Sequence, residues 1–210
     1  ISAVSRETII DIIASLSGST KGTAVAGVLG ALITLSKTNV TIGDYVSIFA
    51  ANNIAISTLS DSVQVFVSFG ASGSASGSAG GATIAVSVFE RESKINIGNY
   101  FIARATAGNI DISAIARDVT VLVAFAAAAS ASGNALSGTI PVVYAESTAG
   151  VILGNYADLR AGGTIAVSGH LEDTVVDAAG GLVLSNGVGI GATISTAIFN
   201  NSIFAEIGKN

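Results

Sequence analysis

The residues that could do chemistry are few and scattered along this chain. The only histidine, His170, stands in the run His170-Leu171-Glu172-Asp173, and Asp177 follows it. An imidazole and carboxylates could ligate a metal ion or exchange protons with a substrate. A single histidine seldom makes a metal site alone, and comparable charged runs elsewhere in the chain contain none. We therefore interpret this run as a charged turn and expect no metal site.

Carboxylates are the other candidates, because glycan cleavage needs two of them at a set separation in a cleft, or a cation held by several. The acidic residues occur one or two at a time: Asp44, Asp61, Asp111, Asp118, Asp158, Glu172, Asp173 and Asp177. No group exceeds what a solvated turn would contain. We predict that the chain is not an enzyme and has no catalytic residues and no cofactor; a polysaccharide-degrading β-helix enzyme is the least favoured alternative.

The most distinctive stretch is Ile97-Gly98-Asn99-Tyr100, which returns three times. Its copies are Ile42-Gly43-Asp44-Tyr45, Leu153-Gly154-Asn155-Tyr156 and Ile207-Gly208-Lys209-Asn210, with glycines 55, 56 and 54 residues apart. A fixed period of this size indicates one structural unit laid down repeatedly. We expect the Gly-Asn pair to turn a corner with positive φ and the isoleucine to face inward. The tyrosines have no such structural role, so Tyr45, Tyr100 and Tyr156 are the candidate surface recognition residues.

Short alternating segments fill the rest of each period. Residues 84–89 and 110–112 alternate as half-buried strands should, and after Arg117-Asp118 the apolar side chains of 119–125 line one face of another strand. We interpret the charged patch 90–94 as a solvated turn or edge. Ala/Ser/Gly tracts such as 70–77 resemble flexible linkers. Their return in phase between apolar segments favours an ordered structure instead.

These elements predict an all-β fold, a parallel β-helix (β-solenoid) built from repeats of about 55 residues. Roughly six short strands in each period suggest two coils per repeat, with three as the alternative. With two coils, the equivalent tyrosines would lie about 10 Å apart and could not stack. We expect one continuous solenoid segment over residues 1–210, with repeat phases near 1–55, 56–111, 112–166 and 167–210, cut from a longer chain.

Composition narrows the partners. The net charge of −5 and only nine Lys and Arg residues argue against a nucleic-acid partner, which would need a basic face. Without cysteine, disulfides cannot hold the fold. The uncharged stretches 62–89, 119–145 and 178–205 are long enough for a membrane helix. Because Ser, Thr, Gly and Asn interrupt all three, we expect no transmembrane helix.

The repeat pattern resembles that of very large bacterial surface proteins, the leukotoxin-family filamentous adhesins, related in style to filamentous haemagglutinins and other type V secreted passengers. The residues that carry the resemblance are 107–114, 161–167, 192–201 and 205–208, and it covers essentially the whole chain. The recurrent tyrosines and the absence of an amino-terminal secretion domain depart from the family pattern. The resemblance implies a location outside the cell, at the bacterial surface, and carries over no catalytic residues.

We therefore expect a structural and adhesive segment of a secreted bacterial surface fibre or filament. Its few charges favour self-association with other copies or with neighbouring solenoid segments. The alternative is a ligand- or glycan-binding module of an adhesin or toxin passenger, which would meet a host surface or a glycan through the three tyrosines.

Overall fold

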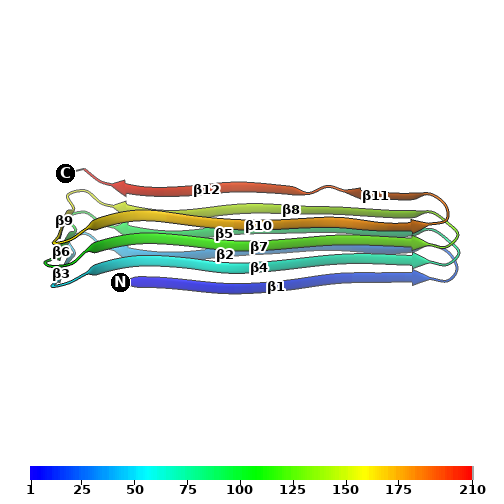
Figure 1. Ribbon diagram of the computed structural model, residues 1–210, viewed down its shortest axis with the longest axis horizontal. Coiled ribbons are helices and arrows are strands. Elements are labelled where there is room, and N and C mark those ends of the chain that lie inside the picture. The colour runs from blue at the N-terminus through cyan, green and yellow to red at the C-terminus, as the bar shows by residue number, and fades with distance from the viewer. Residues whose placement is uncertain (210) are drawn as a thin grey trace.

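Every regular element of residues 1–209, the part of the chain described by this computed structural model, is a β-strand (Figure 1). The first coil has two long strands and a short one, β1 (Ser2–Ser19), β2 (Ala24–Ile42) and β3 (Ser47–Ala50). The next two coils repeat this order as β4 (Ile54–Ser74), β5 (Ala79–Ile97), β6 (Ile102–Ala105), β7 (Ile110–Ser130), β8 (Ala135–Leu153) and β9 (Asp158–Ala161). The last contains β10 (Ile165–Ser185), β11 (Gly189–Thr193) and β12 (Thr196–Ile207). The fourth copy of the tyrosine stretch ends at Asn210, outside the described residues.

The strands form three parallel sheets, which confirms the β-solenoid. Sheet A has the order β1-β4-β7-β10, and sheet B has the order β11-β8-β5-β2, with β12 also paired to β8. Sheet C contains the short strands in the order β3-β6-β9. All pairing is parallel and joins equivalent residues of successive repeats, as Ser57 pairs with Ser2 on one side and with Ser113 on the other.

Each repeat of about 55 residues is therefore one coil, and the expectation of two or three coils was wrong. The segments that we counted as separate strands belong to a single long one, since β7 runs without a break through Arg117 and Asp118. These two residues do not mark a turn, because Arg117 points outward and Asp118 inward. The patch 90–94 is likewise part of β5, with Arg91 buried inside.

The solenoid is flat, with the long strands of sheets A and B lying face to face (Figure 1). At one end, which we call the three-sided end, sheet C closes the coil, and the interior has room for large apolar side chains. Ile56, Ile95, Phe101, Ile112 and Val151 are buried there. This cluster is the main hydrophobic core, and its side chains come from all three walls of the coil.

At the other end, which we call the two-sided end, the turns 20–23, 75–78, 131–134 and 186–188 connect sheet A directly to sheet B. Inward positions here hold mainly Ser, Thr, Ala and Gly, with valine at 28 and 183, and the two sheets approach closely. A Cβ added to Gly81 would lie 2.4 Å from the carbonyl oxygen of Ala127 on the facing sheet. The Ala/Ser/Gly tracts are thus ordered, as their phase predicted: each forms the end of a long strand of sheet A and continues into the following turn. Their small side chains permit the close approach.

Pro141 explains why the last strand of sheet B is divided. β8 pairs with β5 without interruption, but on its other side the ladder stops at Thr193 opposite Thr139 and resumes at Thr196 opposite Val142. The gap lies beside Pro141, which has no N–H to donate to a neighbouring strand. The missing donor falls on the side of the last coil, where β11 ends and β12 begins.

Candidate functional site

The three predicted recognition residues lie at the corner between sheets B and C, one in each of the first three coils. Tyr45, Tyr100 and Tyr156 have φ values of 59°, 56° and 58°, in the left-handed region that side chains disfavour. Our expectation that the preceding Gly-Asn pair has the positive φ was wrong. Glycine is needed there for another reason, because a Cβ on Gly98 would lie 2.7 Å from the carbonyl carbon of Gly43 in the coil below.

The residue between the glycine and the tyrosine ties each coil to the next. An Asp44 carboxylate oxygen accepts the backbone N–H of Asn99 at 2.7 Å, and the Asn99 side-chain carbonyl accepts that of Asn155 at 2.9 Å. The Asn155 side-chain carbonyl accepts the N–H of Lys209 at 2.9 Å. The Asp/Asn position therefore satisfies backbone donors at the corner, which would otherwise depend on water.

The tyrosine rings stack on one another along the axis of the solenoid. The ring centroids of Tyr45 and Tyr100 are 4.8 Å apart with an interplanar angle of 4°, and those of Tyr100 and Tyr156 are 5.0 Å apart at 10°. The expectation that the tyrosines could not stack was wrong, because it assumed two coils per repeat. The three residues are 74%, 43% and 55% exposed. The tyrosine ladder therefore presents ring edges and hydroxyl groups to solvent, while both faces of the Tyr100 ring are covered.

This geometry gives the tyrosine ladder a structural role that sequence alone did not reveal. Holding a tyrosine at positive φ costs about 1–3 kcal/mol. A stacked aromatic pair returns about 0.5–1.5 kcal/mol beyond area burial, and the Asp/Asn ladder beneath it fixes the turn. Chemically, the exposed strip can donate and accept hydrogen bonds and offer apolar ring edges. Recognition of a ligand by these tyrosines stays a prediction.

The histidine run lies within β10 and is not a turn. His170 and Glu172 point outward and are exposed, whereas Asp173 and Asp177 point to the interior. The structure thus divides this run between the two faces of sheet A. Within residues 1–209, we find no group of three or more His, Cys, Asp or Glu side chains that could hold a metal ion.

A column of alternating charge crosses the outer face of sheet A. Arg6, Asp61, Arg117 and Glu172 lie on neighbouring strands in register. Arg117 Nε lies 3.6 Å from Glu172 Oε2. Alternation of sign avoids the repulsion that identical charges would cause at adjacent strand positions. Because three of these side chains are exposed and Asp61 is half-buried, the column favours this register more than it adds to stability.

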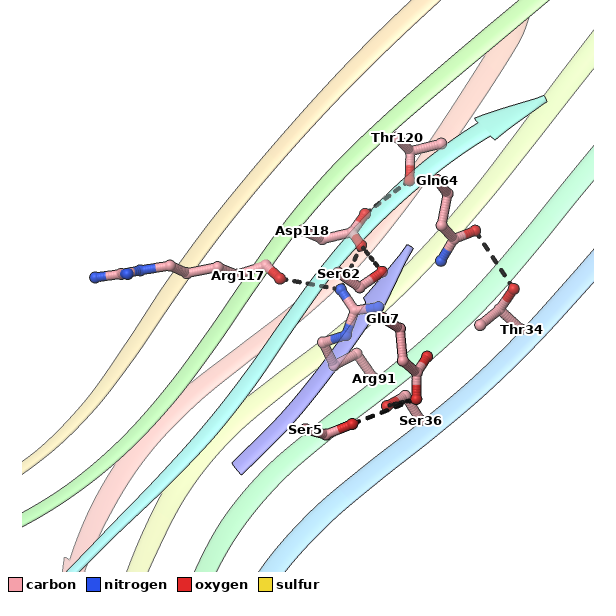
Figure 2. A network of polar contacts seen from close by, with 10 residues as sticks. All are labelled: Ser5, Glu7, Thr34, Ser36, Ser62, Gln64, Arg91, Arg117, Asp118 and Thr120. Atoms are coloured by element: carbon pink, nitrogen blue, oxygen red, sulfur yellow. Dashed lines mark hydrogen bonds and ion pairs between the residues drawn. The ribbon is translucent and has the colours of Figure 1, made fainter. Parts of the chain in front are cut away.

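The groups with the most unusual environment lie inside the solenoid (Figure 2). Arg91 on β5 forms a fully buried ion pair with Asp118 on β7. Asp118 also accepts hydrogen bonds from Ser62 at 3.1 Å and Thr120 at 2.7 Å, and Arg91 donates to the backbone carbonyl of Arg117 at 3.2 Å. Arg91 Nε and Nη2 find no partner among residues 1–209. The network joins the two sheets midway along their length and has no path to a substrate.

Further inward polar side chains extend this network along the coils. In the first coil a Glu7 carboxylate oxygen accepts from Ser5 at 3.3 Å and from Ser36 at 3.1 Å (Figure 2). In the last coil, burial raises the pKa of the Asp173 carboxyl, and the nearby Ser147 hydroxyl offsets this effect only in part. The burial of these residues was not predicted from the sequence, because charged residues usually lie in solvated turns. The signal that could have found them is strict alternation, which places Arg91 and Asp118 on the inward side.

Among residues 1–209, the surface hollows are lined mainly by small or apolar side chains, with Asp111, Arg104 and Arg160 as charged lining residues. A wide hollow of about 730 Å³ at the two-sided end is lined by Ser, Gly, Ala, Thr, Leu and Asn residues of all four coils.

In the part of the chain that the structure describes, no helix is long and apolar enough to cross a membrane. No family model, no curated protein and no solved structure matches the chain.

Proposed function

We propose that this chain is a stiff structural and adhesive segment of a secreted fibre or filament at the surface of a bacterium. The observation that carries the proposal is the continuous in-register pairing of equivalent residues through all four coils. Strands of up to 21 residues are hydrogen-bonded along their length to the coils above and below. Such stacking makes a rod in which the backbone hydrogen bonds between coils run parallel to the solenoid axis.

The turns add to this stiffness because side chains lock each of them to the coil before. At the two-sided end Ser74, Ser130 and Ser185 donate to the carbonyls of Gly22, Gly77 and Gly133 at 2.6, 2.6 and 2.7 Å. At the second corner of the three-sided end the Asn53 and Asn109 side chains accept backbone N–H groups of the following coil at 2.8 Å. With all three corners held, bending the rod would break hydrogen bonds in several places at once.

The distribution of chemical groups supports a mechanical role over catalysis. The ion pair of Arg91 and Asp118 is fully buried and shared between sheets, and the lone histidine is separated from the inward carboxylates by the sheet itself. Export and a surface location rest on the resemblance to type V secreted passengers. Stability without cysteine fits such a route, since hydrogen-bonded ladders and not disulfides hold the coils together.

Pulling the chain by its two ends in a single-molecule force experiment tests the mechanical role. Unfolding coil by coil should release about 55 residues in each event, or roughly 190 Å of contour length. Regular steps of that size at substantial force are expected of a stiff stacked rod. Extension at low force without regular steps would refute the proposal.

Recognition through the tyrosine ladder is the second candidate function. The observation that favours it is the row of three exposed tyrosine edges with their hydroxyl groups at one corner. A glycan or another polar ligand on a host surface would suit such a strip, because hydroxyls and ring edges offer hydrogen bonds beside apolar area. Replacing Tyr45, Tyr100 and Tyr156 together by serine should abolish adhesion to glycan-coated surfaces; unchanged adhesion by the folded variant would exclude this function.

A further inference from the structure

The half of the molecule nearest the two-sided end is apolar on its outside. On sheet B the alternate residues of 25–33, 80–88, 136–144 and 190–198 point away from the interior, and none of these twenty side chains is charged. Leu29, Ile84, Leu136 and Ile140 are among the exposed large hydrophobic residues. Inward positions of the same strands hold polar residues such as Ser87 and Ser137. We call this outer surface of sheet B the apolar face.

The size of the apolar face exceeds that of an ordinary exposed patch. Five outward positions per strand cover about 33 Å along the strands, and four strands cover about 19 Å across them. The resulting flat area of roughly 600 Å² is at the upper limit for monomeric proteins. Two such faces in contact would bury about 1,200 Å² in total, which passes the threshold of roughly 1,000 Å² for a specific interface.

Most charged residues that border the apolar face lie on one side of it, and Lys21, in the turn 20–23, lies at its other end. Lys37, Glu90, Glu92 and Lys94 begin immediately beyond it, toward the three-sided end. Lys37 lies 3.3 Å from Glu90, and Lys94 lies 2.8 Å from Glu92. The rim therefore presents both signs of charge and would not repel a like surface.

Two outward glycines in the apolar face have no intramolecular reason to be glycine. A Cβ added to Gly27 or Gly138 would meet nothing within 4 Å among the described residues. Glycine weakens a strand, and it often marks a place where another backbone approaches. Gly138 and Ala82 line a shallow hollow of about 170 Å³ between larger neighbours such as Ile84 and Ile140. This hollow between larger side chains could accommodate side chains from a facing sheet.

The structure itself offers a surface that matches the apolar face. The outward residues of sheet A at the same end are also uncharged, and they include Val63, Val119 and the stacked pair Phe69 and Phe125. A second copy thus presents the same spacing between strands and the same apolar character on either of its broad sides. Such sheets pack face to face at about 10 Å with interdigitating side chains.

From the area of the apolar face, the mixed charges at its border and the matching outer surface of sheet A, we propose that the apolar face of sheet B is a lateral docking surface for a second copy of this chain. This inference deepens the proposed fibre function by naming the partner and the surface through which rods lie side by side. A bilayer is the competing apolar partner. It is less suited, because the adjoining turns expose backbone polar groups and Lys21, which the hydrocarbon region would not satisfy.

Sedimentation velocity over a concentration series tests the proposal with two matched substitutions on β8. Ile140→Lys places a charge in the apolar face, and Ile152→Lys makes the same change outside it; the two isoleucines are 40% and 36% exposed. Wild type should form species larger than the 20.6 kDa monomer. Ile140→Lys should weaken association at least about tenfold, because an unpaired charge would be buried in the contact, and Ile152→Lys should match wild type.

Far-UV circular dichroism and thermal melting should show that both variants fold, and Ile84→Lys on β5 provides a second disruption of the apolar face. Equal association of wild type, Ile140→Lys and Ile84→Lys would overturn the proposal. So would monomeric wild type that floats with phosphatidylcholine and phosphatidylglycerol vesicles in a manner that Ile140→Lys abolishes, since the partner would then be lipid. If wild type is monomeric but still unfolds in regular steps in the force experiment, the proposed lateral contact is refuted and the stiff-fibre function is not affected.

Discussion

Removing Arg91 should reveal how strongly the buried ion pair supports the solenoid. In Arg91→Met, Asp118 would keep its hydrogen bonds from Ser62 and Thr120 but lose the ion pair with Arg91. Both partners have fully buried side chains, and breaking such a pair costs about 3–5 kcal/mol because one charge stays buried and uncompensated. That is a large fraction of the roughly 5–15 kcal/mol by which native domains are stable.

The assay is equilibrium urea unfolding followed by far-UV circular dichroism, with two comparison variants. Arg91→Met/Asp118→Asn removes both charges and keeps a hydrogen-bonding side chain at 118, so it should recover at least about 2 kcal/mol of the loss. Arg104→Met removes the same side chain from an exposed ion pair with Asp158 and should cost far less, because solvent screens that pair. A loss in Arg91→Met no larger than in Arg104→Met, or no recovery in the double variant, would refute the reasoning.

Three further substitutions test other parts of the structure. Gly98→Ala would place a Cβ 2.6 Å from the backbone nitrogen of Asp44 and should destabilise the fold by about 2 kcal/mol or more. In Gly43→Ala the added Cβ meets nothing within 4 Å, so this control should be tolerated. Thermal melting should therefore show a lower melting temperature for Gly98→Ala than for Gly43→Ala, and equal melting temperatures would contradict this. Burial raises the pKa of Asp173 above its ordinary value of 3.8, so the ionised form destabilises the fold at neutral pH and this penalty disappears as pH falls. Asp173→Asn should therefore melt at a higher temperature than wild type at pH 7 and at nearly the same temperature at about pH 3.5; equal melting at pH 7 would contradict this. Pro141→Ala restores a backbone donor beside the gap between β11 and β12, and slower amide hydrogen exchange at residues 193–196 is expected, while unchanged exchange would exclude the proline as the cause.

The sequence was sufficient to predict the repeat and the fold class, because alternation and a fixed period are visible in the residues themselves and do not depend on which residues are in contact. The number of coils depended on how a charged pair in mid-strand is interpreted. Arg117-Asp118 indicated a break, since charges usually mark solvated turns. In this solenoid the pair sits inside β7, where Asp118 is neutralised by Arg91 from a different coil and a different sheet.

The candidate site shows the same dependence on three-dimensional register. The spacing of Tyr45, Tyr100 and Tyr156 was evident, but whether their rings touch followed only from one coil per repeat. The need for Gly98 was also recognised for the wrong reason, because a backbone contact between coils leaves no mark in a single repeat. The polar interior and apolar exterior of the two-sided end required knowing which of the two alternating sets faces inward.

The central claim, one in-register coil per repeat, is tested most directly by spin labels on a chain that has no native cysteine. Ser57, Ser113 and Ser168 are outward residues paired on successive strands of sheet A, and each can be replaced by cysteine and labelled with a nitroxide. Labels at 57 and 113 should sit about 4.8 Å apart at the backbone and show strong spin exchange, and labels at 57 and 168 should be about 10 Å apart. Backbone separations of about 10 and 20 Å, as two coils per repeat would require, would contradict the account.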